Sequence, residues 1–364
     1  MEAQRVCAGL RKRGYSVTVL CAGAPAMPDT AWWTDPYGVP VRIFARGFSG
    51  ALRDYWFALA VAWTLWSERH NYRLVYFHMP GLHLAFGLPL AQLLGKPVIM
   101  KIPGSGILTA MRHSFLGRLE LGCLRRWARR IMILNSDMEK EALDAGLPKQ
   151  ILYWMPNPVD TDEFAPATPD ERASLRHKFE IPLDVPLVLY VGRLAPEKRL
   201  PSLLKAFART AERVPEARLV LVGDGPEGEK LKQIVERLDL SCRVRLAGRK
   251  PGAEVHLWLQ AGDVFALVSA NEGFSCALSE AMATGLPSVV SAIAANLQLV
   301  DDGVHGLHFP VGDEDSLTAA LTTLLSNPRL RAEMGKASRQ RILDHYSMDK
   351  ILRLYEALFD DALG

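Results

Sequence analysis

The sequence predicts an α/β protein of two domains, each a doubly wound parallel sheet with helices on both faces. Short apolar runs alternate with amphipathic segments of about 10–15 residues, which is the pattern of parallel strands joined by helices. A proline-rich stretch, 154–171, interrupts this alternation. A chain of 364 residues also favours about two domains over a single core.

The first domain is predicted over residues 1–160. Its buried strands are expected at apolar runs between helix-like segments: 15–20, 73–77, 96–102 and 130–134. The chain opens on a helix-like segment, whereas a doubly wound domain normally begins with a strand and a glycine-rich turn. We therefore expect this domain to lack its first strand, and the reading frame to continue upstream of Met1.

The second domain is predicted over residues 161–344. Its strands are expected at 186–192, 217–223, 242–248, 263–269 and 286–291, with helices near 200–212, 227–237, 253–260 and 276–284. The remaining segment, 345–364, has apolar residues at the spacing of an amphipathic helix that needs a partner surface.

Composition bounds the functional class. Hydrophobic residues make up 49% of the chain and charged residues 23%, which is typical of globular proteins and not of disordered ones. The net charge is only +3, and we predict no nucleic-acid partner. The five cysteines are scattered without a C-x-x-C pair, which indicates a reducing compartment. We expect a cytoplasmic protein, with contact to the inner face of a membrane left open.

Two glutamates flank the turn in the stretch "NEGFSCALSEA". Backbone N–H groups near Gly273, Phe274 and Ser275 are expected at a helix start, where such groups bind phosphate. Glu272 precedes the turn, and Glu280 leans back toward it from inside the helix. Carboxylates accept hydrogen bonds from sugar hydroxyls, so the pattern fits a nucleotide-sugar site. A solvated cap and a surface glutamate fit it equally well.

A second pattern lies in "YVGRLAPEKRL", where a strand and a glycine turn precede Arg193 and Lys198. A diphosphate leaving group needs compensating positive charge, which a guanidinium and an ammonium group supply. Because both patterns follow strands of the same predicted sheet, we expect them at its carboxyl edge, where ligands bind in such folds.

The second half resembles the donor domain of retaining GT-B glycosyltransferases of glycosyltransferase family 4, the group 1 glycosyltransferases. The resemblance rests on motifs in order: "GRLAPEK", "LVGDGPE", "VRLAGR", "DVFALVSANEGFSCALSEAMATGLPSVVS" and "DDGVHGLHFPVGD". It extends from about residue 130 to the end. It implies two Rossmann-like domains that face a central cleft, the first on the acceptor side, with the final helix crossing back to the first domain.

The resemblance also implies roles. Arg193 and Lys198 would bind the diphosphate and Glu272 the transferred sugar, and we predict these three as catalytic. Glu280 would bind the ribose, and backbone near Arg249 and Lys250 the base. The donor would be a UDP- or GDP-linked sugar used as a co-substrate, with no cofactor and no metal, and the acceptor a glycan or a lipid-linked glycan.

Two departures affect the acceptor side. Pro103 in "KIPGSG" stands where the family carries a histidine, and Ala294 and Ala295 replace an expected glycine pair. A non-catalytic nucleotide-sugar-binding protein or partner subunit therefore remains an alternative to a transferase. An epimerase or a phosphorylase of the same fold is a further one.

Other patterns have simpler interpretations. "GDGPEG" matches G-x-G-x-x-G, but the next strand does not end on the acid that a dinucleotide site requires. The D-x-D sequences at 160–162 and 313–315 are predicted as turns or helix caps. The basic stretch 112–130 fits a solvated helix face or an anionic lipid surface. Trp32 and Trp33 fit acceptor or membrane contacts, and core packing is expected for Trp56.

Overall fold

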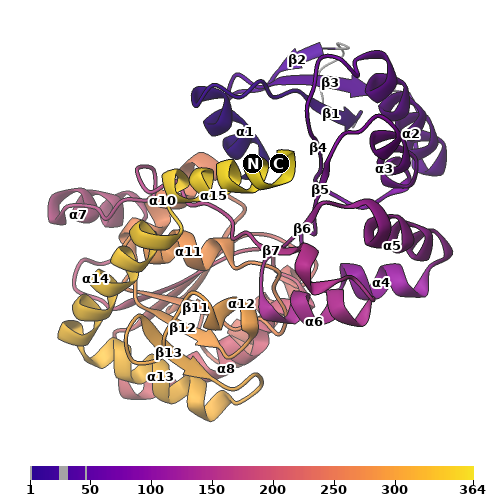
Figure 1. The fold of residues 1–364 in the computed structure, drawn as a ribbon. Helices are drawn as coiled ribbons and strands as arrows, with labels where there is room; N and C mark the ends of the chain where they lie inside the picture. Colours follow the sequence, from indigo (N-terminus) through magenta and orange to yellow (C-terminus); the bar gives the residue numbers. More distant parts are fainter. Residues whose placement is uncertain (1, 24–31, 46) are drawn as a thin grey trace. The chain divides into compact units, whose positions relative to one another are not determined.

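The computed structural model describes residues 2–23, 32–45 and 47–364, and the chain divides into two compact units (Figure 1). Unit 1 comprises residues 1–158 together with 348–364, and unit 2 comprises residues 159–347. The last helix of the chain therefore belongs to the same unit as the first helix.

Unit 1 contains a three-stranded sheet in the order β1-β3-β2 and a four-stranded sheet in the order β4-β5-β6-β7. The strands are β1 Val19–Ala22, β2 Trp32–Thr34, β3 Pro40–Phe44, β4 Val75–Phe77, β5 Val98–Lys101, β6 Arg130–Ile133 and β7 Leu152–Trp154. The second sheet is entirely parallel, as expected. Among the residues that the structure describes, β1 pairs only with β3 and β4 only with β5.

The pairing of β2 with β3 is antiparallel, so the expectation of purely parallel sheets is wrong for this part of unit 1. The sequence "DPYG" between the two strands explains the difference. The Asp35 carboxylate accepts hydrogen bonds from the backbone N–H groups of Tyr37 and Val39 at 2.9 and 2.8 Å. Gly38 supplies a φ of +79°. Aspartate, proline and glycine at this spacing favour a tight turn, which only antiparallel neighbours can use.

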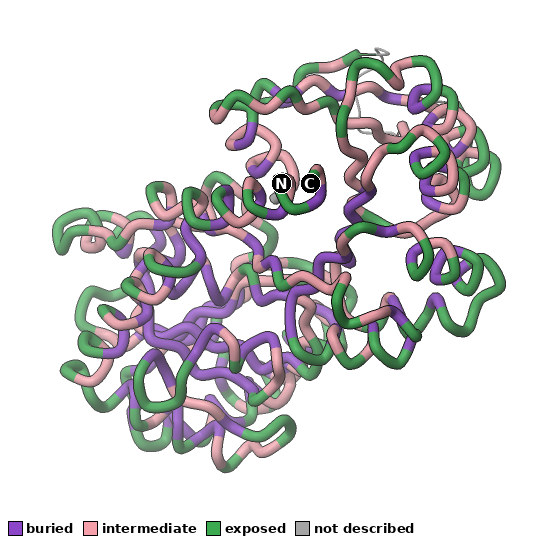
Figure 2. The backbone as a smooth tube through the Cα atoms, viewed as in Figure 1, coloured by how far each residue is buried: buried purple, intermediate pink, exposed green. Residues whose placement is uncertain are grey.

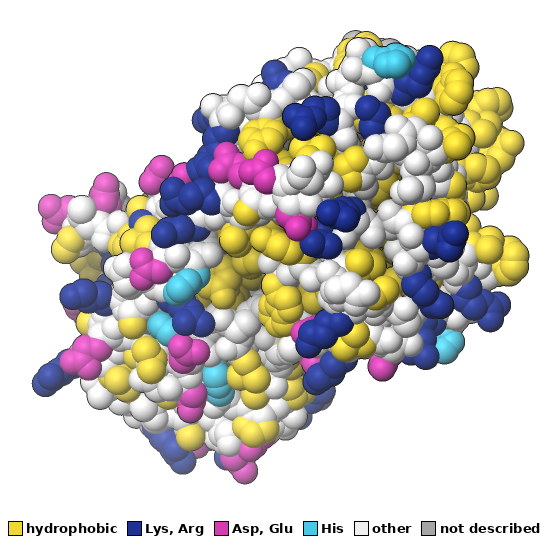
Figure 3. Space-filling view, viewed as in Figure 1, with side chains coloured by type: hydrophobic (Ala, Val, Ile, Leu, Met, Phe, Trp, Pro, Cys, Tyr) yellow, Lys and Arg dark blue, Asp and Glu magenta, His cyan; other side chains and the backbone are white. Residues whose placement is uncertain are grey.

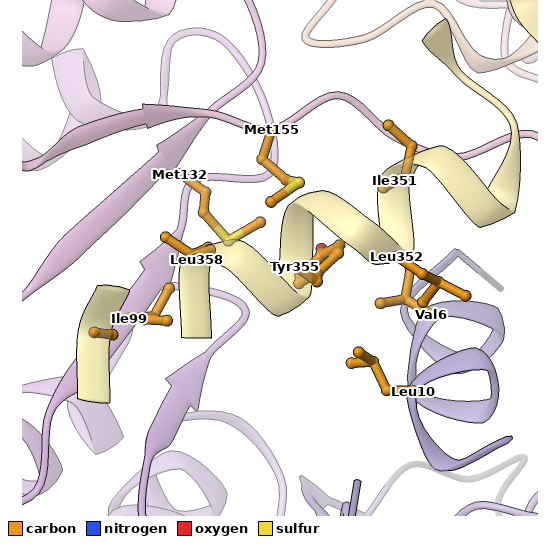
Figure 4. Close-up of a cluster of buried hydrophobic side chains, with 10 residues drawn as sticks. Val6, Leu10, Ile99, Met132, Met155, Ile351, Leu352, Tyr355 and Leu358 are labelled. Atoms are coloured by element: carbon orange, nitrogen blue, oxygen red, sulfur yellow. The ribbon is translucent and has the colours of Figure 1, made fainter. Parts of the chain in front are cut away.

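The helices of unit 1 are α1 Glu2–Lys12, α2 Gly50–Ser67, α3 Leu82–Leu93, α4 Ile107–His113, α5 Phe115–Trp127, α6 Ser136–Asp144 and α15 Met348–Leu363, with a 3₁₀ turn at Lys149–Ile151. The apolar stripe predicted near the end of the chain lies on α15 and packs against α1 and the second sheet (Figure 4). The buried members are Val6, Leu10, Ile99, Met132, Met155, Ile351, Leu352, Tyr355, Leu358 and Ala362. Arg13, directly after α1, also pairs with Glu356 of α15 at 2.7 Å.

Trp56 is 45% exposed on α2, so the expectation that it packs in the core is wrong. The helix α2 carries apolar residues on opposite sides. Its sequence therefore does not indicate which side faces the sheet. The basic stretch 112–130 forms most of α5 and the end of α4. The break between these helices is at Ser114, whose Oγ accepts a hydrogen bond from the Gly117 N–H at 3.0 Å and caps α5.

Unit 2 is built on a six-stranded sheet in the order β10-β9-β8-β11-β12-β13, in which every strand pair is parallel. The strands are β8 Leu187–Val191, β9 Arg218–Val222, β10 Val244–Gly248, β11 Val264–Leu267, β12 Ser288–Ser291 and β13 Gly306–Phe309. All except β13 lie inside apolar runs predicted as strands. The strands β11 and β12 are buried at every position (Figure 2), since helices cover both faces.

The helices of unit 2 are α7 Pro169–Lys178, α8 Leu200–Arg213, α9 Gly228–Arg237, α10 Gly252–Ala261, α11 Cys276–Ala283, α12 Ala294–Leu297, α13 Glu314–Ser326 and α14 Pro328–His345, with a 3₁₀ turn, η2, at Pro196–Lys198. The D-x-D aspartates serve as predicted. Asp160 accepts the Glu163 N–H at 3.1 Å in a turn, and Asp313 accepts the Ser316 N–H at 2.9 Å at the start of α13. None of the described helices is long and apolar enough to cross a membrane.

A buried ion pair fixes the amino ends of the two central strands of unit 2. Arg176 of α7 donates to Asp263 Oδ2 at 2.6 Å, and the same oxygen accepts the backbone N–H of Leu187, the first residue of β8, at 2.8 Å. Asp263 immediately precedes β11. Both β8 and β11 begin at this pair. The pair therefore also aligns the opposite ends of the two strands, which carry the candidate site.

Candidate functional site

The carboxyl ends of β8 and β11 meet at the point where the strand order of unit 2 reverses. From β8 the chain proceeds to β9 and β10 on one side, whereas β11, β12 and β13 lie on the other. Loops at such a switch point diverge and leave room for a ligand. The two patterns predicted from the sequence, the Arg193–Lys198 loop and the Glu272 loop, follow these two strands.

A direct ion pair joins the two loops. Lys198 Nζ donates to Glu272 Oε1 at 2.5 Å, and the Ser269 hydroxyl donates to the same oxygen at 2.7 Å. The side chains of Lys198 and Glu272 are only 17% and 13% exposed. A backbone hydrogen bond of 2.9 Å from the Ala270 N–H to the Glu197 carbonyl adds a second link. Residues 74 positions apart in the chain thus form one charged unit.

Tyr190 fixes the first part of the β8 loop. Its ring is fully buried, and its hydroxyl donates to the Arg193 carbonyl oxygen at 2.9 Å. Burial raises the pKa of this hydroxyl strongly, and the nearby carboxylates of Glu272 and Glu197 raise it further. Tyr190 therefore remains a neutral hydrogen-bond donor and holds the backbone at Arg193 in place, while the Arg193 side chain is exposed.

A chain of buried polar groups supports the Glu272 loop. The Ser275 hydroxyl donates to Asn296 Oδ1 at 2.6 Å, and Asn296 Nδ2 donates to the Ser291 carbonyl oxygen at 2.9 Å. The Ser291 hydroxyl in turn donates to the Ser269 carbonyl oxygen at 2.6 Å. All four side chains are almost completely buried. The network connects the start of α11 to the end of β12 and to the residue that binds Glu272.

A cavity of about 440 Å³ opens over the loops that follow β8, β9 and β10. Its lining residues are Val191, Gly192, Arg193, Val222, Gly223, Asp224, Gly225, Arg249, Lys250 and Val255. Three cations and several glycines thus surround one space, an arrangement that suits an anionic ligand held by backbone N–H groups. Lys198, Glu272 and Glu280 do not belong to the lining within the described chain.

The glycines of "GDGPEG" serve close packing of two loops. A Cβ atom at Gly223 would lie 1.8 Å from the Gly192 carbonyl oxygen, and one at Gly225 would lie 2.4 Å from the Leu194 carbonyl oxygen. The β8 and β9 loops are therefore in backbone contact, and the Leu194 N–H donates to the Asp224 carbonyl at 2.9 Å. This explains the glycine spacing without a dinucleotide.

Of the other predicted residues, Gly273 and Phe274 lie just before α11, Glu280 lies on α11, and Lys250 lies just before α10. Phe274 is buried, with its ring centroid 6.1 Å from that of Tyr346, so its side chain supports the loop from below. Gly273 and Glu280 are half-buried. Lys250 lies with its ammonium group 5.5 Å from the ring centroid of Trp258, a cation–π contact that limits its range.

Sequence analysis missed Tyr190, Ser291 and Asn296. The available signal was weak: each is a polar residue at or just after a predicted strand. Asn296 directly follows Ala294 and Ala295, where the resemblance led us to expect only glycines. Its role depends on contacts across strands that are distant in the chain.

Two family profiles match the chain. The one described as Glycosyltransferase Family 4 matches residues 3–163, and the one described as Glycosyl transferases group 1 matches residues 171–341. The first profile precedes the candidate site, and the second contains every residue of it named above except Tyr346.

Individual proteins that are similar to this chain are also glycosyltransferases. A GDP-mannose-dependent alpha-(1-6)-phosphatidylinositol monomannoside mannosyltransferase from Mycolicibacterium smegmatis is 34% identical over 206 residues, 55% of this chain and 53% of that protein. The chain thus spans about half the length of this relative. An alpha-D-kanosaminyltransferase from Streptomyces kanamyceticus is 26% identical over 95% of this chain and 96% of that protein. The crystal structure of Anabaena Alr3699/HepE in complex with UDP and glucose shares the fold, with a TM-score of 0.82 at 21% identity over 99% of this chain and 95% of that one.

Proposed function

The chain belongs to glycosyltransferase family 4, the group 1 glycosyltransferases, with the GT-B fold, and from this membership we propose that it transfers a sugar from a UDP- or GDP-linked donor to a glycan or lipid-linked acceptor with retention of configuration. One relative supports the acceptor class, because it is a phosphatidylinositol monomannoside mannosyltransferase.

The observation that carries the proposal is the charged unit at the switch point of unit 2. Lys198 and Glu272 come from two loops and form an ion pair, and the loop that carries Lys198 also carries Arg193, which lines the cavity together with Arg249 and Lys250. A nucleotide sugar needs cations for its diphosphate and acceptors for its hydroxyl groups, and both kinds of group are present within one site.

In the proposed reaction the acceptor hydroxyl oxygen bonds to the anomeric carbon on the face from which the diphosphate departs. The bond between that carbon and the diphosphate oxygen breaks, and the acceptor proton passes to this oxygen. Negative charge therefore grows on the diphosphate, where Arg193 and Lys198 would stabilise it without a metal ion. Lys198 has three N–H donors, so it can keep its bond to Glu272 while it binds a phosphate oxygen.

The carboxylates would hold the rest of the donor. Glu272, oriented by Lys198 and Ser269, would accept hydrogen bonds from the transferred sugar. Glu280 on α11 would accept them from the ribose. Backbone near Arg249 and Lys250 would contact the base at the far end of the cavity.

The test is transfer by the full chain from UDP- and GDP-sugars to a pool of lipid-linked and free glycans, with the anomeric configuration read by NMR. Arg193→Ala and Lys198→Ala should each lower kcat by roughly 10²–10³-fold, whereas affinity for the bare nucleoside should change little. The exposed Arg237→Ala on α9 is the matched control and should transfer at the parent rate.

Each alternative gives a different result. Donor binding without transfer to any acceptor would contradict the transferase and favour a non-catalytic binding protein. Turnover of the sugar nucleotide without an acceptor would favour an epimerase. Transfer at the parent rate by both Arg193→Ala and Lys198→Ala would contradict the binding of the diphosphate by these two side chains.

A further inference from the structure

One face of unit 1 exposes large apolar side chains from three helices that pack side by side, α2, α3 and α5. The residues that define this apolar face are Leu52, Trp56, Trp63, Trp66, Leu93 and Phe115. Trp63, Leu93 and Phe115 are 68%, 78% and 74% exposed. In Figure 3 hydrophobic side chains gather along the right-hand edge, where Figure 1 places α2 and α3.

The exposed apolar residues of α2 follow helical periodicity. Leu52, Trp56, Trp63 and Trp66 are separated by four, seven and three positions, which places them on one side of the helix. The opposite side already packs against its own domain through Ala58, Val61 and Leu65. The four exposed residues are therefore not needed for packing within the domain. Contiguous apolar surface of this kind marks an interaction site.

The charged side chains that α4 and α5 expose are all positive. On α4 and α5 the exposed charged side chains are Arg112, Arg118, Arg125 and Arg126, whereas the one acid of these helices, Glu120, is buried. Throughout the described chain, Arg112, Arg118 and Arg126 form no ion pair and no side-chain hydrogen bond. In the part of the chain that the structure describes, these three arginines have no partner for their charge, so they can bind an anionic surface.

We propose that the apolar face and these arginines dock unit 1 on the surface of an anionic lipid bilayer. Tryptophan and phenylalanine insert favourably at the boundary between headgroups and acyl chains, and arginine beside them binds lipid phosphate. A two-fold contact with a second copy fits less well. Such a contact brings the same patch against itself and sets arginine against arginine. The proposal goes beyond sugar transfer and requires neither donor nor acceptor.

The experiment is co-sedimentation of the full chain with two kinds of vesicles: phosphatidylcholine alone, and equal parts of phosphatidylcholine and phosphatidylglycerol. We expect binding to the mixed vesicles that high salt weakens, with a blue shift of tryptophan fluorescence. Each arginine near an anionic leaflet contributes roughly a fivefold factor, so Arg118→Gln with Arg126→Gln should lower the partition coefficient about 25-fold. Trp63→Ala with Phe115→Ala should also lower the partition coefficient and reduce the blue shift, to which Trp56 and Trp66 still contribute.

The controls lie at exposed positions on unit 2: Lys336→Gln removes one positive charge, and Leu183→Ala truncates one exposed apolar side chain. These should bind as the parent does. Because all substituted side chains are exposed, melting temperatures should stay within a few degrees, and the charge variants keep the test valid even if the tryptophan variant folds poorly. Equal binding to both vesicles, parent-level binding by the arginine variants, or a dimer that these substitutions dissociate would overturn the proposal.

Discussion

At the scale of single residues, burial controls the protonation of one carboxyl group in unit 1. Glu120 on α5 is 3% exposed, and its Oε1 has no hydrogen-bond partner in the described chain. Burial raises its pKa to about 7, and a hydrogen bond from the Gly81 backbone N–H offsets part of the rise. The folded protein therefore binds a proton here that the unfolded chain releases near its ordinary pKa of 4.5.

This difference predicts a pH dependence of stability. The contribution of the protonated Glu120 is complete below pH 4.5 and is lost as pH rises through about 7. Glu120→Gln keeps the shape without the charge, so its melting temperature should exceed that of the parent at pH 8.5 and approach it at pH 5. The measurement is thermal melting across that range. Parallel profiles for the two proteins would contradict the raised pKa.

Asn296 should be needed for the conformation of the Glu272 loop. In Asn296→Leu the buried Ser275 hydroxyl and Ser291 carbonyl lose their partner, at a cost on the order of 1–3 kcal/mol for each group. We expect a lower free energy of unfolding by urea denaturation and weaker donor binding. Asn327→Leu, which removes a helix cap far along the chain, controls for stability alone. Unchanged donor affinity in a folded Asn296→Leu protein would show that the network does not position the loop.

At the scale of elements, the contact between the β8 and β9 loops depends on Gly223. Alanine here would place a Cβ atom against the Gly192 backbone, and backbone cannot yield as a side chain can. Gly223→Ala should cost more than about 2 kcal/mol. Gly303→Ala also has a positive φ but open space around it, and should cost only about 1 kcal/mol. Equal losses in chemical denaturation would show that the close approach is unimportant.

The final helix should be essential to unit 1. Leu358 of α15 is fully buried among side chains of the second sheet and α1, so Leu358→Ala should destabilise by roughly 2–5 kcal/mol. Limited proteolysis should then cut residues 1–150 faster. The exposed Asp360→Ala on the same helix is the control. Parent-like proteolysis of Leu358→Ala would mean that α15 does not stabilise the unit.

Most strands of unit 2 could be predicted because they are buried on both faces. A run such as Leu187–Val191 is apolar throughout, as expected for a strand with four of its five residues buried. The strand Pro40–Phe44 alternates between buried and half-buried residues beside the exposed Trp32, and a short strand of this kind lacks a continuous apolar run. Trp56 was assigned to the wrong side of its helix because α2 has large apolar residues on opposite sides and therefore no continuous polar face to orient it.

At the scale of the whole molecule, residue types and spacing predicted which loops carry the site but not how they join. Arg193, Lys198 and Glu272 could be predicted because each follows a strand whose end lies at the edge where ligands bind. The Lys198–Glu272 pair depends on β8 and β11 being neighbours. That order is a property of sheet assembly, which periodicity along the chain does not encode.

The most direct measurement is calorimetric titration of UDP-, GDP- and ADP-sugars into the full chain and its Glu280→Ala variant. The account predicts saturable binding of at least one sugar nucleotide, with a matching rise in melting temperature. Glu280→Ala should weaken that binding by roughly 1.5–3 kcal/mol, the scale of a hydrogen bond to a charged group. No binding of any sugar nucleotide would contradict a donor site in unit 2, and full affinity in Glu280→Ala would contradict the assignment of the ribose to α11.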